Sequence, residues 1–329
     1  MSERTDHHLG HTGQNGHTGH TGQTGHTGQT GHTGQTGQTG RTDEGSARVL
    51  VGSDLDRTLI YSPRALALGM ADELAPRLLA VEVQHGKPLS FMTERCAELL
   101  VQLIEVAEFV PVTTRTRAQY QRVHLPGSVP GWSPRYAVCA NGGHLLVDGV
   151  TDEDWHARVQ ATLADDCAPL DQIVHHLALA ADPEWTLKRR VAEDLFAYLV
   201  VERELLPPGW TEELTGWADG HGYNVSLQGR KVYLVPQPLT KSAALAEVER
   251  RIGASTVLSA GDSLLDAELL LAADQGFRPG HGELADSGWT APGVVALRET
   301  GVAAGVEIVR RLLARALILT APAAAAAAR

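Results

Sequence analysis

Short apolar runs alternate with segments of helical periodicity along most of the chain, and this alternation limits the possible folds more than any other feature. The runs that predict buried strands are residues 49–52, 108–112, 136–140 and 255–260. The segments that predict helices are residues 93–106, 242–252 and 264–273, with Thr93 as the N-cap of the first. Strands that alternate with helices in this way predict an α/β fold with a Rossmann-like parallel sheet covered by helices on both faces.

The middle of the chain has a different pattern. A helical stretch at 151–164 is followed by an aromatic-bearing apolar run and by two strand-like segments, 223–228 and 231–236, with turn sequences between them. This mixture predicts an α+β domain inserted into the α/β core. We therefore expect a first part of the core at residues 46–144, an inserted cap domain at 145–235 and a second part of the core at 236–320.

The two ends of the chain are of low complexity. Residues 1–45 consist almost wholly of Gly, Thr, Gln and His, which bury too little surface to offset the entropy of ordering, so we expect a disordered tail. Its histidines are able to chelate transition metals. The Ala-rich end, residues 321–329, is expected to be a frayed tail.

Charge and cysteine content exclude several classes of protein. The net charge of −11 gives no general attraction to phosphate backbones, so no nucleic-acid partner is expected. The 3 cysteines are widely spaced and contain no CxxC pair, which suits a reducing, cytoplasmic location. No secretory signal and no apolar stretch of the ~20 residues that a membrane span requires is visible, so no membrane partner is expected.

Polar side chains follow three of the predicted strands. Asp54 follows the first strand, Thr113 follows the second and Asp262 follows the last. Ligands bind beyond the carboxyl ends of parallel strands, so we expect these residues to share one site. Carboxylates that would repel one another are tolerated where a divalent cation is bound, and oxygen ligands favour Mg²⁺.

These residue types suit phosphoryl transfer. Asp54 is the candidate nucleophile, forming an aspartyl-phosphate, and Asp56 is the candidate general acid and base. Thr113 and Lys241, which opens a helix, are the candidate phosphate-binding residues. The candidate metal ligands are the acids of both segments: Asp54, Asp56, Asp262 and Asp266.

Four segments together resemble the motifs of the haloacid-dehalogenase-like phosphohydrolases: "DLDRTL", "VTTR", "TKSAAL" and "GDSLLD", in that order. The resemblance covers roughly residues 48–313. The segment "CANGG", residues 139–143, is similar to the one that precedes the large C2-type cap in the Cof and sucrose-phosphatase-like branch. The resemblance implies a Mg²⁺-dependent phosphoric monoester hydrolase with a C2-type cap. The segments "TTRTRAQYQR" and "RPGHGELA" are also similar to phosphatases of bacterial tellurium-resistance and stress gene neighbourhoods.

The chain departs from this motif pattern at two positions. Arg57 stands where the superfamily commonly has Gly, and Thr114 stands where "TGR" is usual, so Thr113 and Thr114 compete for one role; counting back from Arg115 favours Thr113. The candidate substrate-binding residues are Asn141, Arg115 and Lys188, the last in a basic run of the expected cap.

The sequence thus predicts a phosphatase that hydrolyses a small phosphorylated metabolite, such as a sugar phosphate or a nucleotide-like phosphate. Two alternatives stay open at this point. A phosphomutase of the same superfamily would keep the four motifs and return the phosphoryl group to its substrate. A metal-buffering or scaffold protein would act through the His-rich tail.

Overall fold

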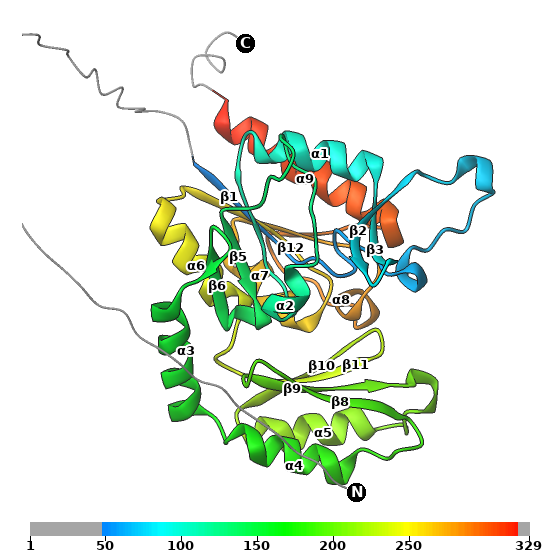
Figure 1. The fold of residues 1–329 in the computed structure, drawn as a ribbon, viewed down its shortest axis with the longest axis vertical. Coiled ribbons are helices and arrows are strands. Elements are labelled where there is room, and N and C mark those ends of the chain that lie inside the picture. Colours follow the sequence, from blue (N-terminus) through cyan, green and yellow to red (C-terminus); the bar gives the residue numbers. More distant parts are fainter. Residues whose placement is uncertain (1–47, 322–329) are drawn as a thin grey trace, which may run out of the picture. The chain divides into compact units, whose positions relative to one another are not determined.

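A computed structural model describes residues 48–321, and its centre is a sheet of five parallel strands (Figure 1). The strands lie in the order β14 (Val294–Ala296), β13 (Gln275–Arg278), β12 (Thr256–Ala260), β1 (Val49–Ser53) and β4 (Glu108–Pro111). All neighbouring pairs are parallel, which confirms the expected sheet.

Helices cover both faces of this sheet because its strands are apolar on both sides. Val49 and Val51 of β1 pack into the cluster that contains α1 (Glu94–Ile104) and α9 (Gly301–Thr320). Leu50, between them, packs into the opposite cluster with α6 (Lys241–Ile252) and α7 (Ala267–Ala272). Successive side chains of a strand point to opposite faces, so a continuous apolar run is buried from both sides.

Two of the predicted elements differ in the structure. The strand expected at 136–140 is β5 (Tyr136–Cys139), which pairs antiparallel with β6 (His144–Val147); β6 pairs in turn with β7 (Val150–Thr151). A single parallel bridge joins β5 to the core through Val138 and Val112. The helix expected at 264–273 is divided into a 3₁₀ turn, Leu264–Asp266, and α7, because Asp266 is used to close the turn.

Threonine caps fix where the helices next to the site begin. The hydroxyl of Thr93 accepts a hydrogen bond from Cys96 N at 3.0 Å, as predicted, and α1 starts at the following residue. The hydroxyl of Thr240 accepts one from Ala243 N at 3.2 Å, so α6 starts at Lys241. A cap of this kind satisfies one of the free N–H groups of the first turn. It therefore places Lys241 at the first position of its helix.

A hairpin lies between β1 and α1 in the sequence. It consists of β2 (Leu78–Gln84) and β3 (Lys87–Thr93), and Tyr61, in the loop after β1, bridges to Phe91 of β3. Two further short helices belong to the core, α2 (Arg117–Tyr120) and α8 (Glu283–Asp286).

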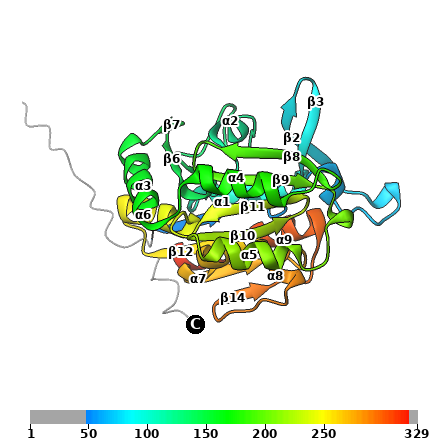
Figure 2. The same cartoon turned by 90° about the horizontal axis from the view of Figure 1, so that it is seen from below.

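The expected cap stretch, 145–235, contains most of a second sheet. This antiparallel sheet has the order β10 (Tyr223–Gln228), β11 (Lys231–Pro236), β9 (Phe196–Val201) and β8 (Thr186–Ala192). Helices α4 (Leu170–Ala180) and α5 (Trp210–Asp219) cover the face of the sheet turned away from the core (Figures 1 and 2). Helix α3 (Glu153–Asp166) instead contacts β6.

All described residues fall in one compact unit. The expected disordered tail at 1–45 with its histidines, and all but the first residue of the Ala-rich end at 321–329, lie outside the described residues. None of the helices within residues 48–321 combines the length and the apolar character that crossing a bilayer requires.

Candidate active site

Three neighbouring strands deliver polar residues to one edge of the core sheet. Strands β4, β1 and β12 are adjacent, and Thr113, Asp54 and Asp262 come shortly after them. The backbone N–H of Asp54 donates to the carbonyl of Ala260 at 2.9 Å, so the loop after β1 is held against the end of β12. The structure thus brings Asp54 and Asp262, which are 208 positions apart in the sequence, to the same edge.

The ammonium of Lys241 bridges two buried carboxylates. Its Nζ lies 2.6 Å from Oδ1 of Asp54 and 2.6 Å from Oδ1 of Asp266. All three side chains are buried, and a charged group is stable in such surroundings only when it is paired and hydrogen-bonded. The three residues therefore form one electrostatic unit.

The second oxygen of Asp266 shapes the turn that carries Asp262. Oδ2 accepts hydrogen bonds from Asp262 N at 3.1 Å, from Ser263 N at 2.9 Å and from the Ser263 hydroxyl at 2.7 Å. Because both carboxylate oxygens of Asp266 are used, this side chain fixes both the lysine and the position of Asp262.

The carboxyl groups of Asp54 and Asp262 hold their protons more tightly than usual. Burial raises the pKa of Asp54 to about 7, although the charge of Lys241 acts in the opposite direction. Burial and the charges of Asp54 and Asp266 raise the pKa of Asp262 well above its ordinary value. Burial therefore disfavours the charged form of both carboxyl groups, and the neighbouring acids add to this effect.

Three carboxylates are close enough to share one cation. Oxygen atoms of Asp54, Asp262 and Asp266 all lie within 4.8 Å of one another. This all-oxygen donor set suits Mg²⁺, and a divalent cation would offset the mutual repulsion of these carboxylates. The residues therefore fit the metal that the sequence predicted.

Asp56 is not part of this carboxylate group. Its two oxygens accept hydrogen bonds from Arg115, at 2.7 Å from Nε and at 2.9 Å from Nη2. Burial acts to raise the pKa of Asp56, but the charge and hydrogen bonds of Arg115 lower it below its ordinary value. Asp56 therefore rests as a carboxylate that faces Arg115, although the sequence analysis placed it among the metal ligands.

Arg115 is held on its other side by the hairpin β2–β3. Its Nη1 donates to Glu82 Oε2 at 2.8 Å, and its Nη2 also donates to the Ser90 hydroxyl at 3.1 Å. All three nitrogens of the guanidinium thus bind protein groups, and the side chain is nearly buried. Arg115 was predicted to bind the substrate, and no sequence signal pointed to Glu82, because only the tertiary pairing of the hairpin brings the two together.

The two adjacent threonines have different surroundings. The hydroxyl of Thr113 accepts a hydrogen bond from Arg115 N at 3.1 Å, and the residue is fully buried. Thr114 instead lines a cavity together with Asp56 and Arg57. The choice of Thr113 rested on counting from Arg115, and the spacing carried no information on which hydroxyl reaches the cavity.

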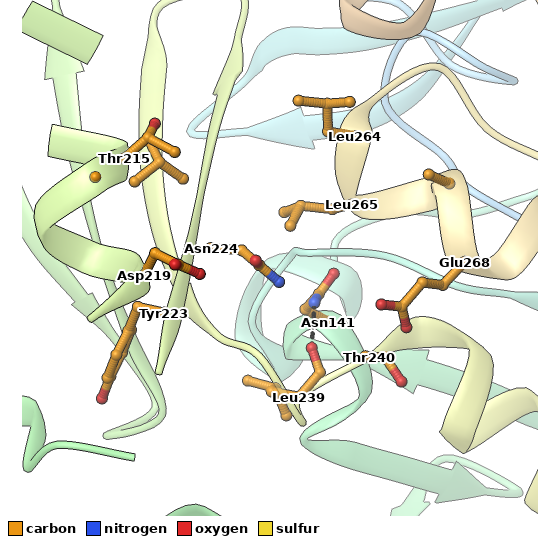
Figure 3. A pocket seen from close by; sticks show the side chains of 13 residues that line it. Asn141, Thr215, Asp219, Tyr223, Asn224, Leu239, Thr240, Leu264, Leu265 and Glu268 are labelled. Atoms are coloured by element: carbon orange, nitrogen blue, oxygen red, sulfur yellow. Dashed lines mark hydrogen bonds between the residues drawn. The ribbon is translucent and has the colours of Figure 1, made fainter. Parts of the chain in front are cut away.

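Asn141 lies at a junction between core and cap. It adopts a left-handed backbone conformation, with a φ of 57°, and its Nδ2 donates to the Leu239 carbonyl at 2.7 Å. It lines a cavity of about 500 Å³ that also contains Asn224 of β10 and Glu268 of α7 (Figure 3). This cavity is larger than the one beside Asp56, but it includes none of the three acids that are close enough to share a cation.

Cap residue Lys188 is exposed on the edge strand β8. It is in register with Val200 of β9, which is in register with Lys231 of β11, so the three side chains point to the same face of the cap sheet. Val200 and Lys231 line the cavity that contains Asp56. The alternation along 231–236 indicates which face of the sheet Lys231 is on, but nothing in the sequence indicates which residues it lies opposite.

Comparison with known proteins supports the fold. A sucrose-phosphatase structure from Synechocystis sp. PCC6803 superposes with a TM-score of 0.52 at 16% identity, over 81% of this chain and 98% of that chain. A Thermoplasma acidophilum structure gives a TM-score of 0.51 at 11% identity, over 81% of this chain and 98% of the other. The predicted fold, an α/β core with an inserted α+β cap, is thereby confirmed.

Sequence comparison gives a partial match. A phosphoglycolate phosphatase of Aeropyrum pernix is 31% identical over 150 residues, which is 42% of this chain. The match spans 61% of the length of that relative. No family model matches the chain.

Proposed function

We propose that this chain, with its haloacid-dehalogenase-like fold, is a Mg²⁺-dependent phosphatase that hydrolyses a small phosphorylated metabolite through an aspartyl-phosphate. The observation that carries the proposal is the pairing of buried Asp54 with Lys241 at 2.6 Å, beside a group of carboxylates that fits a divalent cation. The partial match to a phosphoglycolate phosphatase and the fold shared with a sucrose-phosphatase support a small phosphorylated substrate.

In this mechanism Asp54 attacks the phosphorus atom, and the bond between phosphorus and the leaving oxygen breaks. Lys241 orients Asp54 through Oδ1, which leaves Oδ2 for the attack; the Thr58 hydroxyl lies 3.4 Å from that oxygen. Asp54, Asp262 and Asp266 would hold the Mg²⁺, which offsets the negative charge of the phosphoryl group and of the acids. Lys241 and Thr113 are the proposed phosphate-binding residues.

Asp56 supplies the proton that the leaving oxygen takes up, and it later removes a proton from the water that hydrolyses the aspartyl-phosphate. Arg115 holds this carboxylate away from the metal group. Release from Arg115 removes the interaction that lowers the pKa of Asp56, so the carboxylate takes up a proton from solvent as it turns towards the substrate and then passes it to the leaving oxygen. Asn141 and Lys188 remain proposed substrate-binding residues of the junction and the cap.

The test is phosphate release from a panel of phosphorylated metabolites, including sugar phosphates and nucleotides, with and without Mg²⁺. Wild type is compared with Asp54→Asn and with Asp72→Asn, a matched change at an exposed acid. We expect Mg²⁺-dependent release by wild type and by Asp72→Asn, and a loss of at least about a thousandfold in Asp54→Asn, as for other nucleophile deletions. Equal release by all three proteins would refute the proposal. Release that requires an added bisphosphate would indicate the phosphomutase instead.

A further inference from the structure

A second cavity opens beside Asp56, between the loop after β1 and the hairpin β10–β11 of the cap. Its volume is about 290 Å³, at the small end of ligand sites in proteins. The residues that matter below are Asp56, Arg57 and Arg64 from the core and Arg230, Lys231 and Tyr233 from the cap. A substrate whose phosphoryl group reacts at Asp54 and whose leaving oxygen meets Asp56 would place its leaving group here.

The lining of this cavity is cationic although the chain as a whole is acidic. Four of its residues are Arg or Lys and one is an acid, in a protein of net charge −11. The one acid, Asp56, is already paired with Arg115, and Arg57 is paired with Asp262. Arg230 forms an exposed ion pair with Glu202 at 3.5 Å, so the charge that remains for a ligand comes from Lys231 and Arg64.

Lys231 is the best-placed of these cations. Its Nζ lies 5.8 Å from the ring centroids of both Tyr198 and Tyr233, and no carboxylate within residues 48–321 forms an ion pair with it. The interaction with Tyr233 raises the pKa of Lys231 above its ordinary value. Burial acts in the opposite direction, and the charge of Asp56 raises the pKa further, so Lys231 is charged at neutral pH. A half-buried ammonium without a paired acid is a site for an anion.

The register of the cap sheet extends this positive surface. Lys231, Val200 and Lys188 are in register across β11, β9 and β8, and two residues further along Tyr233, Tyr198 and Arg190 form the next row. Both rows point to the same face, since their positions differ by two along each strand. Arg189, of opposite parity, instead donates from Nη2 to the Ala181 carbonyl at the end of α4.

We propose that the leaving group of the substrate itself carries a second anion, a carboxylate or a second phosphate, which binds Lys231 with Arg64 beside it. This inference rests on the proposed phosphatase function and narrows its substrate class. Lys231 is then a specificity residue supplied by the cap. The esters of neutral alcohols, including neutral sugars, bind without this contact and are poorer substrates.

The test compares three esters with the same carbon skeleton: glycerol phosphate, phosphoglycerate and glycerol bisphosphate. Their ends are an alcohol, a carboxylate and a phosphate, so the comparison also distinguishes the two sources of the anion. p-Nitrophenyl phosphate, whose leaving group carries no second anion, reports whether the enzyme hydrolyses phosphate esters at all. We expect kcat/KM for one of the two acidic esters to exceed that for glycerol phosphate by about tenfold or more.

Three variants assign the preference to Lys231. Lys231→Met is expected to raise KM for the preferred acidic ester by about tenfold to a hundredfold, the range of one charge-assisted hydrogen bond, and to leave KM for glycerol phosphate within about twofold. Lys231→Arg should keep part of the preference. Lys87→Met, at an exposed lysine of the hairpin β2–β3, is the matched control and should change neither value.

Three outcomes overturn the inference alone. The first is a preference for glycerol phosphate, and the second is an equal effect of Lys231→Met on all esters. The third is hydrolysis of p-nitrophenyl phosphate with none of the three glycerol-based esters accepted. If p-nitrophenyl phosphate and all three esters are left intact, the proposed function fails as well.

Discussion

Arg57 donates a hydrogen bond from Nε to Oδ2 of Asp262 at 3.1 Å. It does so from a left-handed backbone conformation, with a φ of 65°, at the position where the resembled motif commonly has Gly. Such a conformation is unfavourable for a residue with a side chain. The guanidinium therefore occupies one oxygen of a proposed metal ligand, at a cost in backbone strain.

Replacing Arg57 with Gly should tighten Mg²⁺ binding. The change removes a positive charge next to Asp262 and frees Oδ2, so we expect the Mg²⁺ concentration for half-maximal binding to fall by up to about fivefold, as for an ion pair worth up to ~1 kcal/mol. Titration calorimetry measures the affinity. Ala67→Gly is the control, since Ala67 also has a positive φ, of 54°. Ala67→Gly should relieve similar strain and leave the Mg²⁺ affinity unchanged. Weaker Mg²⁺ binding by Arg57→Gly than by wild type would contradict this expectation.

Replacing Lys241 with Met should destabilise the fold and make its stability depend on Mg²⁺. Removing one partner of a buried ion pair leaves Asp54 and Asp266 without their counter-charge, which costs about 3–5 kcal/mol. Urea unfolding without metal should show that loss, and added Mg²⁺ should restore more stability in the variant than in wild type. Lys87→Met should stay within about 0.5 kcal/mol of wild type. A loss below 1 kcal/mol in Lys241→Met would mean that the ammonium does not hold the carboxylates together.

Gly282 is expected to be essential for the metal group. Its φ is 92°, and a Cβ at this position would overlap the carboxylate and the carbonyl of Asp262. Gly282→Ala should therefore displace Asp262 and weaken Mg²⁺ binding at least about tenfold, as measured by calorimetry. Gly288→Ala isolates the backbone contribution, because Gly288 also has a positive φ, of 68°, but has open space around its Cα. Equal Mg²⁺ affinity in the two variants would refute the steric argument.

Glu193, in the turn between β8 and β9, should give a stability contribution that depends on pH. Its carboxylate accepts hydrogen bonds from Arg117 N and Nε and lies 2.9 Å from Nε2 of His144. Burial acts to raise the pKa of Glu193, but these hydrogen bonds lower it from 4.5 to about 2. The stabilisation is therefore complete above pH 4.5, and it is lost as the pH falls from there through about 2.

The variant Glu193→Gln measures this contribution. At pH 7 it should be less stable than wild type by about 1.5–3 kcal/mol, the range for hydrogen bonds to a charged group. Urea unfolding at a series of pH values should show the difference shrinking below about pH 4.5. Asp194→Asn, at the exposed neighbour, should show no such trend. A difference that stays constant down to pH 3 would contradict the assignment.

The sequence by itself determined the strands of the core next to the site and the edge of the sheet at which the acids meet. An apolar run followed by an acid is a local signal, and strands β1 and β12 form where it occurs. A threonine before an amphipathic helix is another, and α1 and α6 start directly after Thr93 and Thr240. Because the carboxyl ends of parallel strands lie at one edge of a sheet, the proximity of Asp54 and Asp262 can be predicted without any knowledge of side-chain contacts.

Only the tertiary structure decided how each polar side chain is used. Asp56 faces Arg115 because the hairpin β2–β3 places Glu82 on the other side of that guanidinium, and no spacing in the sequence encodes this contact. Lys231 reaches the cavity of Asp56 because the face of the cap sheet that α4 and α5 leave uncovered is turned towards the core. These side chains lie far apart in the sequence, and their partners are set by the packing of whole elements, whereas strand ends and helix caps depend on hydrogen bonds between near neighbours.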